Sequence, residues 1–206
     1  MIIDLTHEIT DQMPVYPGDS ATRLTHARVF TSDSYNNYDL SINMHTGTHI
    51  DGPMHLTASQ TYLNEIDLST FIGEGCVIDV SAEPNVIRGK SEYEEIINGK
   101  QIVFFHTGHS KTFGQPAYFC EYPVLSLDIA ELIVKNKVKM IGLDTPSPDK
   151  DPFDVHKYLF EHGVLIIENL TRLDQLLDYK SFEVIALPLN IKADSSIARV
   201  VARVKG

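Results

Sequence analysis

The sequence of 206 residues contains no tryptophan and only two cysteines, and it has 17 basic residues against 28 acidic ones. Cys76 and Cys120 are too few for a disulfide framework, so we expect free, buried thiols in a reducing compartment, with a single bridge as the alternative. The formal net charge of -11 offers no positive surface to a nucleic acid or to an anionic membrane. It equally suits plain solubility and therefore selects no function.

Long apolar runs are also missing from the chain. No stretch approaches the roughly 20 apolar residues that a membrane-spanning helix needs. The amino-terminal segment MIIDLTHEIT carries Asp4 and Glu8 and no lysine or arginine, which is not the pattern of a secretory signal peptide. We therefore expect a cytoplasmic protein.

The composition is that of an ordinary globular protein, with 43% apolar and 22% charged residues. A single hydrophobic core serves chains of up to roughly 250–300 residues, so we expect one domain over residues 1–206. Apolar runs bounded by turn residues predict buried strands at 75–80, 101–105, 138–143, 164–167 and 184–189. Helical patterns lie between several of these runs, at 91–97 and 127–135. This alternation predicts an α/β fold with a mixed β-sheet flanked by helices.

Residues 138–169 form the clearest β-α-β unit. An apolar strand precedes a loop rich in proline and aspartate, a helix capped by Asp154 follows, and a glycine ends that helix before the next strand. A right-handed crossover makes the two strands parallel. Asp144 and Glu168 then lie at the carboxyl ends of their strands, with His156 on the same side, where open α/β sheets bind ligands.

The segment HTGTHIDGPMH places His45, His49, Asp51 and His55 within one short span. Its glycines, proline and β-branched residues oppose a helix, so we expect a strand over 40–45 that ends in a loop. Imidazole and carboxylate are usual protein ligands of zinc and manganese. A polar turn with incidental histidines is the alternative, but the spacing and the glycines favour a metal-binding loop.

Glu168 ends a buried apolar strand, where a lone carboxylate is costly unless it is paired or binds a metal. His156 lies at the same edge of the sheet. With the first cluster these residues supply three imidazoles and two carboxylates, enough for one or two metal ions, and His55 is left over to move protons. A solvent-exposed histidine and a capped strand end are the alternative for this pair.

Other polar residues receive structural roles from their context. His106 and His109 follow an apolar strand, where a polar turn is the simpler explanation than a place in the site. Asp144 and Ser147 are expected to brace the loop that carries His156. The run 149–154 is expected to be a solvated loop.

The order of these motifs resembles the cyclase family of metal-dependent hydrolases, which includes bacterial kynurenine formamidases and isatin hydrolases. The resemblance rests on HTGTHIDGPMH, the opening DLTHEITDQMPVYPGD, the segments FHTGHS and IGLDTPSPD, and the late IALPL. It implies a partly barrel-like sheet, a small-molecule substrate, and a homodimer or homotetramer.

Carried over by position, the resemblance implies that His45, His49 and Asp51 hold one divalent metal ion. Asp51 then reaches a second ion, which His156 binds, and Glu168 contacts both. Zinc is the expected metal and manganese the alternative, because imidazole and carboxylate donors without thiolate suit either ion.

The resemblance further implies that His55 donates and accepts the proton during hydrolysis of a small amide, formamide or lactam. Tyr16 stands where kynurenine formamidases carry a substrate-stacking tryptophan, and ADSSIARV stands where the family often has a glycine and a proline before the arginine. Two alternatives stay open: a metal-dependent cyclase or lyase acting on an enolisable carbonyl, and a metal- or small-molecule-binding protein without turnover.

Overall fold

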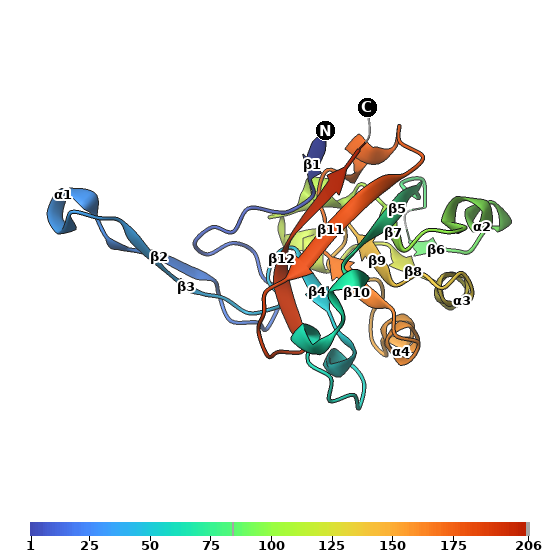
Figure 1. The fold of residues 1–206 in the computed structure, drawn as a ribbon, viewed down its shortest axis with the longest axis horizontal. Helices are drawn as coiled ribbons and strands as arrows, with labels where there is room; N and C mark the ends of the chain where they lie inside the picture. Colours follow the sequence, from blue (N-terminus) through green and yellow to red (C-terminus); the bar gives the residue numbers. More distant parts are fainter. Residues whose placement is uncertain (84, 205–206) are drawn as a thin grey trace.

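A mixed β-sheet forms the centre of the computed structural model, which describes residues 1–83 and 85–204 (Figure 1). Its strands are β1 (Ile2–Asp4), β4 (His49–Asp51), β5 (Ile72–Asp79), β7 (Ile102–His106), β9 (Met140–Leu143), β10 (Leu165–Glu168), β11 (Phe182–Pro188) and β12 (Ser195–Arg203). Their order is β1-β12-β11-β5-β7-β9-β10-β4, and β4 pairs again with β12. The sheet therefore closes on itself, with β1 added at the outside, and the predicted mixed, partly barrel-like α/β fold is confirmed.

The strands predicted from apolar runs are all present. β5, β7, β9 and β10 run parallel, and every residue of β7 and β9 is buried, which explains why these strands are continuous apolar runs. β5 begins at Ile72 instead of Gly75, because its first residues pair with β11. The parallel pairing of β9 with β10 confirms the predicted crossover.

Neighbouring side chains of the parallel strands β7 and β10 pack into two different cores. Phe104 lies inside the closed sheet with Ile50, Phe71 and Val200, whereas the next residue, Phe105, lies outside it. The outer core is covered by the longer helices, which gather on one side of the sheet in Figure 1. The α-helices are α1 (Phe30–Asp33), α2 (Ser91–Ile97), α3 (Leu127–Lys135) and α4 (Asp154–Glu161).

The helix boundaries follow the sequence patterns closely, but the predicted cap of α4 is wrong. Phe153 is the N-cap of α4 in place of Asp154. Gly163 has φ of +73° after α4, as expected of a glycine that ends a helix. None of the helices within the described residues is long and apolar enough to span a membrane.

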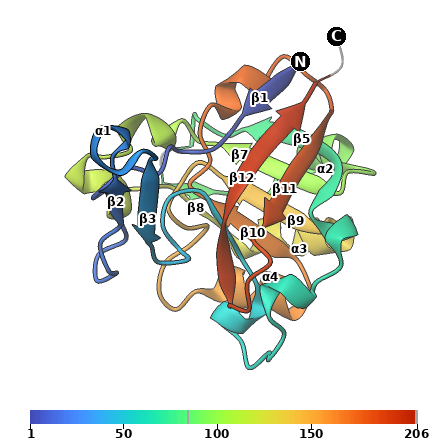
Figure 2. The same ribbon diagram turned by 60° about the vertical axis from the view of Figure 1, so that its left-hand side comes forward.

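A two-stranded arm projects from the body of the molecule (Figures 1 and 2). It consists of β2 (Arg23–Arg28), α1 at its tip, and β3 (Asn37–Ser41). The predicted strand at 40–45 is wrong in its bounds, because β3 ends at Ser41 and His45 lies in a turn. All residues of β3 are exposed, so the apolar alternation that begins at Leu40 buries no face of a strand.

The remaining elements are short. The 3-10 helices are Pro53–His55, Leu63–Glu65, Leu68–Thr70, His109–Thr112, Pro116–Phe119 and Leu173–Leu176, and a small separate sheet pairs β6 (Val86–Ile87) with β8 (Val124–Leu125). Both cysteines are free; Cys76 is buried as expected, but Cys120 is exposed.

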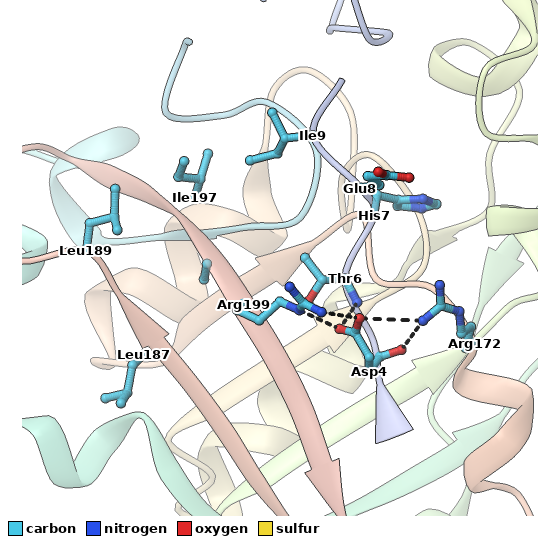
Figure 3. A pocket seen from close by; sticks show the side chains of 11 residues that line it. Asp4, Thr6, His7, Glu8, Ile9, Arg172, Leu187, Leu189, Ile197 and Arg199 are labelled. Carbon is cyan, nitrogen blue, oxygen red and sulfur yellow. Dashed lines mark hydrogen bonds and ion pairs between the residues drawn. The ribbon is translucent and has the colours of Figure 1, made fainter. Parts of the chain in front are cut away.

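Ion pairs of Asp4 fasten the amino-terminal strand to the sheet (Figure 3). The Asp4 carboxylate accepts two hydrogen bonds from the guanidinium of Arg199, at 3.0 and 2.8 Å, and lies 3.6 Å from that of Arg172. These residues line a cavity of about 630 Å³. The Asp4 carboxylate thus lies between two arginines at the edge of this cavity.

His7, on the same segment, is expected to make the fold sensitive to acid. Burial and the nearby charge of Arg172 lower the pKa of His7 to about 4, and its ring stacks on Phe113 at 3.8 Å. In the unfolded chain His7 is protonated below about pH 6.5, whereas in the folded chain it stays neutral down to about pH 4. The free energy of unfolding therefore falls as the pH drops from 6.5 toward 4. We expect the variant His7→Phe, measured with a chelator present, to lose less of its melting temperature over this interval than the unchanged protein. Parallel losses in the two proteins would show that His7 plays no part.

Candidate metal centre

The short strand β4 positions two of the predicted metal ligands. It lies between β10 and β12, with His49 opposite Glu168 on one side and Ile197 on the other. Successive side chains of a strand point to opposite faces. Ile50 is fully buried in the inner core, so His49 and Asp51 share the other face with Glu168.

Five residues from two distant segments converge at this point, as the sequence led us to expect. The ligand atoms of His45, His49 and Asp51 lie within 4.8 Å of one another, and so do those of Asp51, His156 and Glu168. His45 Nδ1 lies 2.9 Å from Asp51 Oδ1, and His156 Nε2 lies 3.2 Å from Glu168 Oε1. Asp51 is common to the two groups, which is the position of a carboxylate that bridges two ions.

The donors fit a divalent cation. His49 Nε2 and Asp51 Oδ1 are enclosed and make no hydrogen bond of good geometry with any described residue, although they lie 3.4 Å apart and Asp51 Oδ1 is 2.9 Å from His45 Nδ1. Buried polar atoms without partners are rare, and each needs an explanation. A metal ion placed among imidazole nitrogens and carboxylate oxygens would satisfy both atoms.

The electrostatics of the cluster favour positive charge. Burial acts to lower the pKa of His49, but the carboxylates of Asp51 and Glu168 outweigh burial and raise the pKa well above its usual value. At His156 burial likewise acts to lower the pKa, but Asp149 and Glu168 outweigh it and raise the pKa to about 10. The carboxylates therefore attract a cation strongly, and metal ions compete with protons for the same atoms.

Asp149 contacts the cluster through His156, which the sequence did not reveal. The expectation of a solvated loop over 149–154 is wrong at this residue, which is 6% exposed. Its carboxylate lies 2.5 Å from His156 Nδ1 and accepts a hydrogen bond from the Val155 N–H at 2.7 Å. Asp149 thus caps α4 and orients the imidazole so that Nε2 faces Glu168, as carboxylates commonly do for metal-binding histidines.

His55 lies beside the cluster, in contact with another residue absent from our predictions. Asp194 Oδ2 lies 3.2 Å from His55 Nδ1 and 3.0 Å from His45 Nε2. The ring centres of His55 and His45 are 4.2 Å apart. Asp194 comes from the loop before β12, and only the pairing of β12 with β4 brings it here. No local signal in ADSSIARV marks this role.

A cavity of about 270 Å³ opens beside these residues. Its walls include both polar groups of the cluster and apolar side chains: Tyr16, Asp19, His45, His55, Leu56, Phe119, Pro146, Ser147, Phe153, His156, Glu168 and Asn169. Tyr16 is 40% exposed and meets the edge of Phe119, with ring centres 5.9 Å apart. The cavity therefore offers an aromatic wall opposite the histidines and carboxylates.

The other polar residues considered from the sequence lie outside the cluster. His106 Nδ1 pairs with Asp79 at 3.1 Å, and His109 Nε2 lies 2.8 Å from the Tyr118 carbonyl oxygen. Asp144 accepts hydrogen bonds from the Thr107 N–H and hydroxyl, so it braces the turn after β7, and the expectation that it braces the loop carrying His156 is wrong. Ser147 does brace that loop, through its contact with the Asp149 N–H at 3.4 Å.

Comparison with known proteins places these observations in a family. Residues 3–150 match the model of the Cyclase family. The kynurenine formamidase of Bacillus mycoides (strain KBAB4) is 33% identical over 211 residues, which cover 98% of this chain and 96% of that protein. The kynurenine formamidase of Bacillus cereus (strain ATCC 14579) is likewise 33% identical, over 212 residues with the same coverage of both chains.

Solved structures share the fold. An isatin hydrolase bound to the product analogue thioisatinate superposes with a TM-score of 0.89 and 21% identity, covering 100% of this chain and 92% of the other. A potential metal-dependent hydrolase with cyclase activity superposes with a TM-score of 0.79 and 25% identity, covering 98% and 96%. The closed sheet of this chain is thus a fold that these solved structures share.

Proposed function

The chain belongs to the Cyclase family, and on that basis we propose that it hydrolyses the C–N bond of a small aryl formamide, amide or lactam. It is a metal-dependent amide hydrolase. The observation that carries this conclusion is the buried cluster of imidazole nitrogens and carboxylate oxygens, in which His49 Nε2 and Asp51 Oδ1 make no hydrogen bond of good geometry, beside a cavity with aromatic side chains in its lining. The relatives named kynurenine formamidase support a formamide on an aromatic ring as the first substrate class to test.

Five residues would hold the metal: His45, His49 and Asp51 on one side, His156 and Glu168 on the other. Zinc is our first candidate and manganese the second; a set of imidazole and carboxylate donors suits either ion. A divalent ion in this position supplies a hydroxide nucleophile at neutral pH and polarises the substrate carbonyl. We propose that this chemistry takes place in the cytoplasm.

His55 would transfer the proton during hydrolysis. Its Nδ1 faces Asp194 at 3.2 Å, so its Nε2 is the ring nitrogen free to face the cavity. Hydrolysis would form a C–O bond at the carbonyl carbon and break the C–N bond. Protonated His55 would give its proton to the departing nitrogen and then take up the proton of the new carboxylic acid, so that an amine and a carboxylate are formed. Tyr16 would stack on the aromatic ring of the substrate.

Hydrolysis in ¹⁸O-labelled water tests this function against its rivals. The protein is incubated with N-formyl aromatics, aryl amides and cyclic imides, and the products are weighed by mass spectrometry. We expect one ¹⁸O atom in the carboxylate or formate product. Consumption of substrate without label would favour a cyclase or lyase, and binding without consumption of any compound would favour a protein without turnover.

We also propose that the protein is a homodimer or homotetramer, supported by the arm. An isolated two-stranded hairpin is marginally stable in water, yet the arm holds Phe30 and Tyr35 at 65% and 54% exposure. A second copy would bury these rings.

We expect the double variant Phe30→Ser, Tyr35→Ser to sediment as a smaller species than the unchanged protein in analytical ultracentrifugation. The matched control is Leu68→Ser, which changes another exposed apolar residue on the body. A monomeric parent protein would contradict the proposal.

A further inference from the structure

Asn169 follows Glu168 directly at the end of β10 and lines the same cavity as His55. Its backbone has φ of +55°, in the left-handed region that asparagine adopts more readily than most residues other than glycine. Only 3% of the residue is exposed. Backbone conformations of this kind persist where surrounding contacts enforce them, and they concentrate at functional sites.

Three hydrogen bonds hold Asn169 in place. Its N–H donates to the Thr145 carbonyl oxygen at 2.9 Å, and its own carbonyl accepts from the Thr48 hydroxyl at 2.6 Å. Its side-chain Oδ1 accepts from the Tyr118 hydroxyl at 2.8 Å. Burial, together with the charges of Asp144 and Glu168, raises the pKa of Tyr118 well above its usual value, so this hydroxyl stays a donor.

These contacts leave one polar group of Asn169 without a partner among the described residues, the side-chain amide nitrogen Nδ2. The other polar atom of the amide, Oδ1, is held by the hydroxyl of buried Tyr118, so Nδ2 points away from Tyr118. Asn169 lines the cavity, and we take Nδ2 to face it. An N–H donor held rigidly at a reaction site stabilises negative charge that develops on a substrate oxygen.

We propose that the Asn169 amide donates a hydrogen bond to the substrate carbonyl oxygen and to the oxyanion formed when hydroxide adds to the carbon. This inference rests on the proposed function and adds a catalytic residue to it. A neutral donor suits the position, because it approaches an oxygen atom without forming an ion pair with the adjacent Glu168. Loss of one such donor costs roughly 100- to 1000-fold in kcat.

The variant Asn169→Gly tests the proposal without disturbing the backbone, because glycine adopts positive φ at no steric cost. We expect kcat to fall by about 100-fold or more, with KM changed far less and metal content retained, and with a lower melting temperature because the buried Tyr118 hydroxyl loses its acceptor. Lys137→Gly is the matched control, since Lys137 is an exposed residue with φ of +57° that does not line the cavity. Tyr118→Phe should lower kcat less, because the amide stays but loses its anchor. Unchanged kcat in Asn169→Gly would overturn the proposal.

A second measurement keeps the inference separate from the function on which it rests. In ¹⁵N-labelled protein, the side-chain amide signal of Asn169 is identified by its absence from Asn169→Gly, and benzoate is titrated as a probe of the carbonyl position. We expect the chemical shift of this signal to change as benzoate is added and to level off when the site is saturated. A shift without turnover on any amide would contradict the proposed function alone. A signal that stays still while benzoate binds would contradict the role of Asn169.

Discussion

Asp51→Asn is expected to empty the metal centre. The carboxylate is buried and lies in both groups of ligands, so the substitution removes a full negative charge from each while keeping the size of the side chain. The amide that replaces it is a poor ligand for zinc. We expect metal content, measured by elemental analysis after desalting, to fall from that of the unchanged protein to near zero, and turnover to fall with it.

Asp79→Asn is the control for this experiment. Asp79 ends β5 at the same edge of the sheet and pairs with His106, outside the ligand cluster. Its variant should keep the metal and the activity. Full metal content in Asp51→Asn, with the circular dichroism spectrum unchanged, would remove Asp51 from the ligand set.

His55→Ala is expected to separate catalysis from metal binding. His55 contacts Asp194 and the ring of His45 but belongs to neither group that contains Asp51. Loss of a general acid and base costs roughly 100- to 10 000-fold in rate. We therefore expect turnover to fall by about a hundredfold or more while the metal content stays at the level of the unchanged protein.

His162→Ala provides the comparison, because His162 is an exposed histidine whose Nδ1 contacts only the Tyr158 carbonyl oxygen of its own helix. It should leave the rate unchanged. Full activity in His55→Ala would mean that another group carries the proton, and loss of metal would mean that His55 is a ligand.

Local sequence patterns predicted the parts of the fold that depend on local physics. The strands β7, β9 and β10 are fully buried, so they appear as apolar runs, and the glycine-rich segment that holds His45, His49 and Asp51 predicted three side chains that converge. The arm misled the same reasoning, because the alternation that begins at Leu40 belongs partly to a strand exposed on both faces.

Long-range pairing determined what the sequence did not show. Ser195 lies opposite Asp51 only because β12 closes the sheet against β4, and this closure brings Asp194 to His55. Asp149 lies in a segment whose composition is typical of a solvated loop, and its burial depends on the packing of α4. Neither carboxylate could be recognised from residues near it in the chain.

Stepwise reconstitution tests the central claim most directly. The protein is stripped with a chelator, zinc is added in increments, and hydrolysis of an N-formyl aromatic amide is followed at each step. The metal centre described above predicts no turnover in the stripped protein, and a rise in proportion to added zinc that stops at one or two ions per chain. Full turnover in the stripped protein, or zinc uptake that leaves the rate unchanged, would contradict it.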